Sequence, residues 1–255
     1  MGLGEKGSPG LAKVRCTRFK DGAFADFEDL VSPEHEVALH WPDRDPVRLW
    51  AFPHQLEELA LGHALLELCA PGQVPAIQWA RDGVYHMVPL EDARSDAPPS
   101  EHSLTPEFVV KAMREFMARP GYWEDTGCFH RMAALDPGSG EFLHVVEDIG
   151  RHNCVDRMAG WALLHGWNPS ALVLCVSARA TASLMRKIMR AGFSCVISRS
   201  AVTTAAMAMA AGARMTLAGF ARPGRFTVFV HKSRTLRIVG ADADHAVLET
   251  REGTA

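Results

Sequence analysis

Three segments of the sequence could hold an anionic ligand, because each places arginine beside hydroxyl or free backbone N–H groups directly after an apolar run. Guanidinium groups bind phosphate through paired N–H donors, and helix N-termini also attract phosphate. The residues of these segments are Ser177, Arg179, Arg199, Thr203, Phe220, Ala221, Arg222, Pro223, Gly224 and Arg225. They predict a site for a phosphate-bearing ligand. The alternative is that these arginines are ordinary solvated residues at strand ends.

The charge distribution bears on the same question. Between Arg157 and Gly240 the chain has twelve lysines and arginines and no aspartate or glutamate, although the formal charge of the whole chain is only −3. Such asymmetry is typical of a protein with an anionic partner. It also arises when two halves of a protein neutralise each other across an internal interface. Composition leaves both interpretations open.

A second cluster consists of Gly150, Arg151 and His152, which follow two acids at the predicted start of a helix. Gly150 would let a ligand approach the backbone, and the next two side chains could donate hydrogen bonds to it. In isolation, this turn fits helix capping by Asp148 or Asn153 better than ligand binding.

Two cysteine–histidine pairs could do chemistry. Cys128 and His130 would share one face of a strand, because alternate residues of a strand point the same way. His152 and Cys154 have the same spacing in reverse order. Structural zinc usually has wider ligand spacings, so we predict no metal site. His130 and His152 are acid–base candidates, and the sequence assigns no catalytic residue.

Strands alternate with helices in the part of the chain that carries these segments, which predicts an α/β fold with helices on both faces of the sheet. The strand-like runs are 171–177, 194–199, 215–220 and 226–230, and the helical patterns are 153–165, 181–191 and 203–211. Ligands of such sheets bind beyond the carboxyl ends of the strands. All three arginine segments lie there.

Composition divides the chain into four parts. Residues 1–30 are rich in Gly, Lys and Asp and are predicted to be a flexible leader. Residues 31–105 hold two hairpins around one helix and end in a polar loop, residues 106–240 form the α/β ligand-binding domain, and residues 241–255 are a tail. We find no secretory signal and no apolar run long enough to span a membrane, so we expect a cytoplasmic protein.

Motifs between about residues 30 and 230 resemble, as a collinear set, those of the formate dehydrogenase accessory sulfurtransferases, the FdhD family. Residues 147–157 (EDIGRHNCVDR) are similar to the family signature EDxGRHNAxDK, and residues 126–130 (TGCFH) to its TG(G/C)xH motif. Residues 177–181, 200–204 and 217–225 resemble its SxRAS, SAxTxLA and LxGFxRxGR segments, and residues 56–62 resemble its ELAxGFL run.

The resemblance implies a cytidine-deaminase-like fold with a mixed sheet, usually as a homodimer. Members of the family bind the bis(molybdopterin guanine dinucleotide) form of the molybdenum cofactor. They carry sulfur to it from a cysteine desulfurase before it enters formate dehydrogenase. The family's cofactor-binding stretch falls on residues 220–225. A tungsten form of the cofactor, and a related oxidoreductase as partner, are equally open.

One family feature is missing. The CxxC loop that carries the persulfide would fall within residues 91–105, which contain no cysteine. We therefore expect an FdhD-like cofactor-binding accessory protein whose sulfur transfer is in doubt. Alternatives are sulfur transfer through Cys128 and a nucleic-acid-binding module. The second is disfavoured because no arginines and aromatic residues interleave into a stacking platform.

Overall fold

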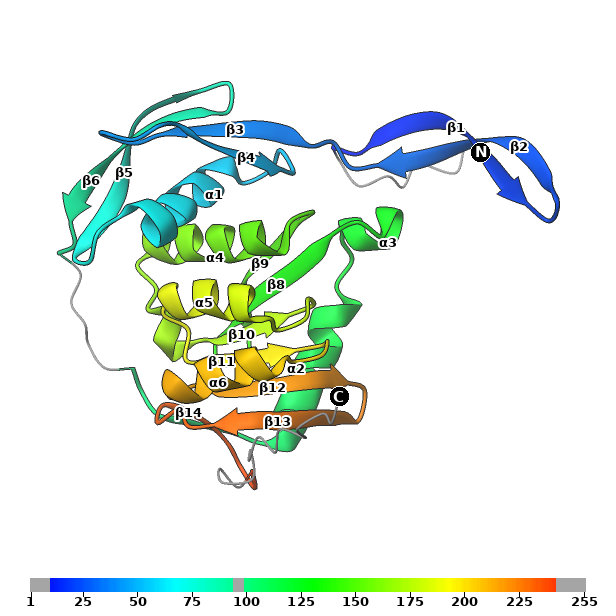
Figure 1. The fold of residues 1–255 in the computed structure, drawn as a ribbon. Helices are drawn as coiled ribbons and strands as arrows, with labels where there is room; N and C mark the ends of the chain where they lie inside the picture. Colours follow the sequence, from blue (N-terminus) through cyan, green and yellow to red (C-terminus); the bar gives the residue numbers. More distant parts are fainter. Residues whose placement is uncertain (1–9, 94–98, 242–255) are drawn as a thin grey trace, which may run out of the picture.

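The protein is described here from a computed structural model that covers residues 10–93 and 99–241. Figure 1 shows an α/β body, an N-terminal layer above it, and a two-stranded arm that projects away from both. Residues 94–98 of the predicted loop and residues 242–255 of the predicted tail lie outside the described residues.

A mixed six-stranded sheet forms the centre of the body, with the strand order β13-β12-β11-β10-β8-β9. Its strands are β8 (His130–Leu135), β9 (Phe142–Asp148), β10 (Val173–Val176), β11 (Cys195–Ser198), β12 (Thr216–Arg222) and β13 (Arg225–His231). Strands β10, β11 and β12 are parallel, whereas β8, β9 and β13 run antiparallel to their neighbours. The predicted α/β class with a mixed sheet is confirmed. The finer cytidine-deaminase-like topology stays a prediction.

Helices cover both faces of this sheet, as predicted. One face packs against α4 (Arg151–His165), α5 (Ala182–Arg190) and α6 (Thr204–Gly212), and the other against α2 (Pro106–Ala118). Strand β10 shows why its sequence is entirely apolar: Leu174 joins the first core and Cys175 the second. Thr105 caps α2 as expected, because its Oγ1 accepts a hydrogen bond from the Phe108 backbone N–H at 3.1 Å.

The N-terminal layer is a four-stranded sheet, ordered β4-β3-β6-β5, above one helix. Its elements are β3 (His35–His40), β4 (Val47–Ala51), α1 (Leu56–His63), a π-helical turn η1 (Ala64–Leu68), β5 (Gln73–Arg81) and β6 (Val84–Glu91). The two hairpins expected from the sequence are present, and parallel pairing of β3 with β6 joins them into one sheet.

Two glycines let the N-terminal layer touch the body backbone to backbone. A Cβ atom on Gly160 of α4 would overlap the carbonyl group of Glu58 in α1. A Cβ atom on Gly62 of α1 would overlap the carbonyl group of Asp156 in α4. Helices α1 and α4 therefore cross at a distance that only glycine permits.

A buried arginine strengthens this seam. Arg157 and Asp148 are both fully buried, and the Arg157 Nη2 lies 2.5 Å from the Asp148 Oδ2. The same guanidinium donates to the carbonyl oxygens of Phe52 at 2.8 Å and Gln55 at 2.9 Å, and also to that of His54. One cation of the acid-free stretch is thus neutralised inside the protein.

Two further cations of that stretch are paired at the same seam. The Lys187 Nζ lies 2.7 Å from the Asp156 Oδ2, and the Arg190 Nη1 lies 2.8 Å from the Glu67 Oε2. The buried Asp156 carboxylate also contacts the His63 Nδ1 at 3.2 Å. Internal neutralisation therefore accounts for part of the charge asymmetry.

Within the predicted leader over residues 1–30, the described residues form secondary structure that the sequence analysis did not predict. Strands β1 (Ala12–Lys20) and β2 (Ala23–Val31) pair as a regular antiparallel hairpin. Asp21 and Gly22 both have positive φ angles, of 53° and 83°, as a two-residue hairpin turn requires. Asp-Gly between runs rich in β-branched and aromatic residues was the signal for this hairpin, and the composition of the segment obscured it.

Three short elements were not predicted. Strand β7 (His102–Leu104), at the end of the predicted loop, pairs with β14 (Leu236–Ile238) and so belongs to the body. Helix α3 (Tyr122–Thr126) precedes the TGCFH motif. Within residues 10–93 and 99–241, no helix is long and apolar enough to cross a membrane.

Candidate functional site

The motif segments gather at one edge of the central sheet because of strand direction. Strand β8 runs antiparallel to β10, so its first residues lie at the carboxyl end of β10. There the Ser177 backbone N–H donates to the Arg131 carbonyl at 3.0 Å, and the Arg131 N–H donates to the Ser177 Oγ at 2.8 Å. The Arg199 N–H donates to the Val176 carbonyl at 2.8 Å. The TGCFH motif therefore meets the two arginine segments that follow β10 and β11.

A pocket of about 260 Å³ opens at this edge. Its lining residues are Met117, Trp123, Glu124, Gly127, Cys128, Phe129, His130, Arg131, Ser177 and Arg199. A thiol, an imidazole, a hydroxyl and a guanidinium group thus converge on one cavity.

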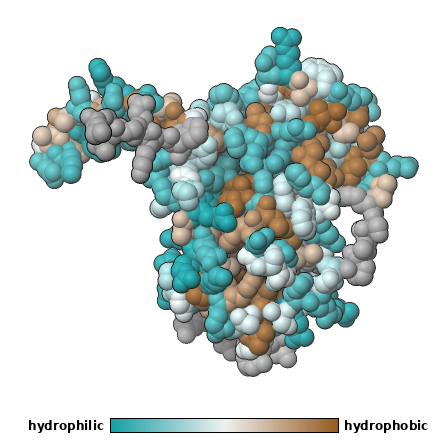
Figure 2. Space-filling view, turned by 180° about the vertical axis from the view of Figure 1, so that it is seen from behind, coloured by the Kyte–Doolittle hydropathy of each residue, from teal (hydrophilic) through white to brown (hydrophobic). Residues whose placement is uncertain are grey.

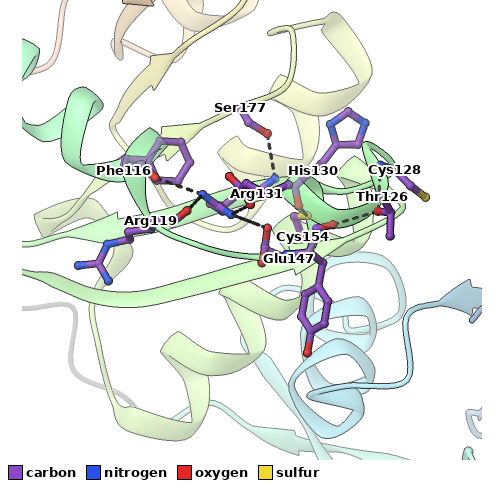
Figure 3. Close-up of polar contacts among 11 residues, drawn as sticks. Phe116, Arg119, Thr126, Cys128, His130, Arg131, Glu147, Cys154 and Ser177 are labelled. Carbon is purple, nitrogen blue, oxygen red and sulfur yellow. Dashed lines mark hydrogen bonds and ion pairs between the residues drawn. The ribbon is translucent and has the colours of Figure 1, made fainter. Parts of the chain in front are cut away.

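Arg131, which the sequence analysis missed, forms a fixed wall of this pocket (Figure 3). Its side chain is buried, and its Nε and Nη2 donate to the Glu147 Oε1 at 3.0 and 2.9 Å. Its Nη2 also lies 3.2 Å from the Glu124 Oε2, and its Nη1 donates to the Arg119 carbonyl at 2.7 Å. This guanidinium is therefore neutralised and holds the pocket in shape. An arginine inside a strand of otherwise apolar residues was the available signal.

Arg199 also lines the pocket, and two further arginines act electrostatically on its imidazole. Burial lowers the pKa of His130 most strongly, and the charges of Arg151 and Arg179 lower it further against the opposing effect of Asp148. The charges of Arg151 and Arg179 therefore act on the imidazole that lines the pocket. Neither these two guanidinium groups nor that of Arg199 makes a hydrogen bond or ion pair with the described residues. All three are available to an anion.

The Cys128 thiol is set by a tight turn. The Cys128 N–H donates to the Thr126 Oγ1 at 3.2 Å, and that hydroxyl donates to the Tyr122 carbonyl at 2.9 Å. Gly127 between them has a φ angle of 68°, which favours glycine. Burial, followed by the negative charges of Glu34 and Asp148, raises the pKa of the Cys128 thiol. The sulfur is therefore protonated at neutral pH.

Several predicted site residues have structural contacts instead of lining the pocket. The Gly150 N–H donates to the Asp148 Oδ1 at 2.8 Å, which fixes the turn before α4, but no side chain caps the first N–H groups of this helix. The Thr203 Oγ1 caps α6 by accepting from the Ala206 N–H at 3.2 Å. His152 is half-buried and does not line the pocket. Burial lowers its pKa first, and Arg151 and Lys187 lower it further.

The run from Phe220 to Arg225 forms the end of β12 and its turn into β13. Phe220 has a φ angle of 50°, and its N–H donates to the Ser200 carbonyl at 2.9 Å. The residue is 38% exposed. Ala221 is buried in the core. Arg222 and Arg225 are cross-strand partners around the Pro223-Gly224 turn.

Arg225 faces a different hollow from Ser177 and Arg199. This second hollow, of about 650 Å³, lies between the β12–β13 turn and α2. It is lined by Pro106, Glu107, Val110, Lys111, Arg114, Gly224, Arg225 and Phe226. The predicted site is therefore divided: Ser177 and Arg199 line the pocket, Arg225 lines the α2 hollow, and Arg151 and Arg179 line neither. Arg222 lines neither cavity.

The two cysteine–histidine pairs do not form a metal centre in the described part of the chain, where no three His, Cys, Asp or Glu side chains are arranged to hold an ion. Cys154 is buried, and its Sγ contacts the His130 carbonyl oxygen at 3.5 Å.

Comparison with known proteins decides the family. A sequence model of the FdhD/NarQ family matches residues 80–236. The chain belongs to the FdhD/NarQ family. The protein FdhD of Methanocaldococcus jannaschii is 28% identical over 220 residues, which cover 86% of this chain and 96% of that protein. The sulfur carrier protein FdhD of Chromobacterium violaceum is 28% identical over 258 residues. The match covers 86% of this chain and 95% of that protein.

The sulfur carrier protein FdhD of Bacillus subtilis is 34% identical over 135 residues, which cover 53% of this chain and 51% of that protein. The fold is shared with the crystal structure of a Desulfotalea psychrophila protein named as a formate dehydrogenase accessory protein. The two structures superpose with a TM-score of 0.73 and 22% sequence identity. The match covers 87% of this chain and 97% of the Desulfotalea chain. The family resemblance drawn from the motifs is confirmed.

Proposed function

We propose that this FdhD-family protein binds the bis(molybdopterin guanine dinucleotide) form of the molybdenum cofactor, or its tungsten form, as an accessory factor for formate dehydrogenase or a related oxidoreductase. The observation that carries the proposal concerns Arg199, which lines the pocket, and Arg151 and Arg179, whose charges act on His130: none of the three has an ion-pair partner among the described residues. This cofactor has two diphosphates, and guanidinium groups are the side chains best suited to hold them. When bound, the cofactor would supply the metal and its sulfur ligands.

Each neighbouring group has a role in such binding. Arg199 and the Ser177 hydroxyl would donate to one diphosphate, and Arg151 and Arg179 would balance its charge. Arg131 would keep the wall fixed, because its own charge is already satisfied by Glu147 and Glu124. The Asp148 carboxylate is held by Arg157, so it does not compete for these arginines.

Phe220 supports the placement of a guanine ring near the β12–β13 turn. A bulky residue with a φ angle of 50° is strained, and such strain is concentrated at ligand-binding sites. The exposed ring would offer a face for stacking, and base–aromatic stacking contributes about 1–3 kcal/mol. Arg225 and the nearby Lys111 and Arg114 would attract a second phosphate group into the α2 hollow.

Binding of GDP, a fragment of the cofactor, tests this proposal by isothermal titration calorimetry. The double variant Arg179→Ala, Arg199→Ala should bind GDP at least tenfold more weakly, because hydrogen bonds to charged groups contribute about 1.5–3 kcal/mol each. The matched control is Arg186→Ala, Arg214→Ala, which removes the same charge away from the pocket. Equal affinity in the two double variants would reject the pocket as the site.

Two further variants test the turn. Phe220→Ala should weaken GDP binding without a change in net charge. The double variant Arg222→Ala, Arg225→Ala should weaken GDP binding because it removes two positive charges. Unchanged affinity in both would restrict the site to the pocket and remove residues 220–225 from it.

A second candidate function is sulfur transfer through Cys128, favoured by the position of this thiol in the same pocket. A desulfurase persulfide would transfer its terminal sulfur to the Cys128 thiolate. An S–S bond forms at Cys128, the donor S–S bond breaks, the desulfurase leaves as a thiolate, and the Cys128 proton passes to solvent. Incubation with a cysteine desulfurase and labelled cysteine, followed by peptide mass mapping, tests the transfer. An unmodified Cys128, or equal labelling of a Cys128→Ser variant, would end it.

A further inference from the structure

A further cavity, the seam cavity, lies where the N-terminal layer meets the body. Its volume of about 640 Å³ is within the range of about 300–1,000 Å³ that is typical of small-molecule sites. Its walls come from η1, the turn before β5 and the last turns of α4 and α5. Because α5 runs back along the sheet from the carboxyl end of β10, its last turn lies at the opposite sheet edge from the pocket. Both helices end on the side of the molecule away from the arm (Figure 1), where Figure 2 shows hydrophobic residues gathered.

Small residues on α4 make room for the seam cavity, and apolar side chains surround that room. Ala159 and Ala162 of α4 and Gly166 at its C-cap are spaced three and four residues apart, so they share one face of the helix. Leu65 of η1 and Trp167 add an aliphatic wall and an aromatic ring. Trp167 is 41% exposed, although tryptophan is highly buried on average. The cavity can therefore enclose the apolar part of a ligand.

One guanidinium group can hold a carboxylate in the seam cavity. Of the lining residues in the described part of the chain, only Arg190 and Asp92 carry a charge. The Arg190 Nη1 lies 2.8 Å from the Glu67 Oε2, and the Arg190 side chain is 45% exposed. Because a guanidinium has five N–H donors, the contact with Glu67 leaves donors for a ligand. Guanidinium groups bind carboxylates through paired N–H donors.

Asp92 and two helix ends supply the opposite polarity. The Asp92 N–H donates to the Gly72 carbonyl at 2.9 Å, which fixes Asp92 beside the turn before β5. The ends of α4 and α5 border the cavity through Leu163 and Ala191. Backbone carbonyl groups give the C-terminal end of a helix a partial negative charge, which stabilises a nearby cation. A carboxylate and two helix ends together can therefore hold an ammonium group.

We propose that the seam cavity binds a free amino acid with an apolar side chain. Arg190 holds the α-carboxylate, Asp92 and the helix ends hold the α-ammonium group, and Trp167 and the α4 face enclose the side chain. A zwitterion suits this lining because the cavity has one charged side chain of each sign. A simple acid or a simple amine would leave one of the two charges without a counterpart. The inference is independent of what the pocket binds.

Isothermal titration calorimetry of the full chain with four probes tests the proposal. L-phenylalanine should bind to one site per chain. Phenethylamine lacks the carboxylate and 3-phenylpropionate lacks the ammonium group, so each should bind at least tenfold more weakly. L-serine has both charges but no apolar side chain, and its affinity should also be at least tenfold lower. These four measurements use the wild type, so they do not depend on the folding of any variant.

Two variants assign each charge of the ligand to a side chain. Arg190→Gln should weaken the binding of L-phenylalanine at least tenfold but leave phenethylamine unaffected, because that probe has no carboxylate. Asp92→Asn should weaken L-phenylalanine but leave 3-phenylpropionate unaffected, because that probe has no ammonium group. The matched controls are Arg186→Gln on α5 and Asp82→Asn in the β5–β6 turn, which remove the same charges away from the cavity. Thermal melting by circular dichroism confirms that each variant is folded.

Three results would overturn the proposal. The first is no binding of L-phenylalanine to the wild type at concentrations up to about 10 mM. The second is equal affinity for L-phenylalanine, phenethylamine and 3-phenylpropionate, which would mean that only the aromatic ring is recognised. The third is stronger binding of one single-charge probe than of L-phenylalanine, which would assign the cavity to an acid or to an amine. None of these results depends on whether GDP binds to the pocket.

Discussion

Cations from one acid-free stretch of the sequence have opposite fates in two regions of the molecule. At the seam between α1, α4 and α5, Arg157, Lys187 and Arg190 each meet a carboxylate. At the edge of the central sheet, Arg179 and Arg199 meet none within the described residues. The first group stabilises the fold, and the second is free to act on a ligand.

The difference shows that the absence of acids nearby in sequence does not leave a cation unpaired. The carboxylates at the seam come from Glu67, Asp148 and Asp156, all outside the acid-free stretch. What separates the two groups is position. Arg157 lies inside α4, whereas Arg199 directly follows β11 and Arg179 lies in the loop between β10 and α5.

The largest effect is expected when the seam loses a charge. Arg157→Ala leaves the Asp148 carboxylate buried without its partner, which should lower the free energy of unfolding by about 3–5 kcal/mol. Arg199→Ala, at the pocket on the edge of the central sheet, should change the free energy of unfolding by less than about 0.5 kcal/mol. Urea denaturation measures both. Similar losses in the two variants would erase the distinction between seam and pocket.

A somewhat smaller effect is expected from crowding the same seam. Gly160→Ala would push α1 away from α4 and should cost about 1–3 kcal/mol of stability. Gly212→Ala is the control, because nothing lies within 4 Å of its new methyl group, and it should be neutral or slightly stabilising. Thermal melting compares them. An unchanged melting temperature for Gly160→Ala would show that the two helices are not in close contact.

At the pocket, the expected effect is a change in the affinity for GDP with pH. Burial and Arg151 lower the pKa of His130, so the free protein has a neutral imidazole at pH 7. A bound diphosphate would raise that pKa and favour proton uptake, so affinity for GDP should rise severalfold from pH 8 to pH 6. In His130→Gln the rise should shrink to the part that comes from the ligand's own titration. Identical pH profiles would place His130 away from the phosphates.

The smallest expected effect concerns the rate of Cys128 alkylation. Because burial, Glu34 and Asp148 raise the pKa of this thiol, iodoacetamide should modify it slowly at pH 7 and progressively faster above pH 9. Glu34→Gln removes one of the two negative charges and should increase the rate at pH 7 about twofold to threefold. Peptide mass mapping identifies the modified cysteine. A rate at pH 7 that is unaffected by Glu34→Gln would show that the carboxylate does not act on the thiol.

Much of the body could be predicted because its signals are local. Strands such as Val173–Val176 and Cys195–Ser198 are buried on both faces and are therefore almost entirely apolar. The Thr105 cap can be predicted from the residues that follow it, Pro106 and Glu107. The parallel pairing of β3 with β6 and the short pair β7–β14 could not be predicted, because they depend on contacts between segments far apart in the sequence.

The candidate site divides in the same way. The position of Ser177 and Arg199 at the sheet edge follows from the rule that ligands bind beyond the carboxyl ends of parallel strands. That Cys128 and His130 line the same pocket depends on β8 lying antiparallel beside β10, which local periodicity does not encode. The separation of Arg225 from the pocket depends on where α2 packs.

The main-chain bonds of Arg157 have a consequence for how the protein is made. A ribosome releases the carbonyl groups of Phe52 and Gln55 about a hundred residues before the side chain that binds them. During synthesis these two carbonyl groups therefore lack their hydrogen bonds from Arg157 until α4 has emerged. A truncated protein that begins after residue 55 would lack all three carbonyl oxygens that accept hydrogen bonds from the Arg157 guanidinium.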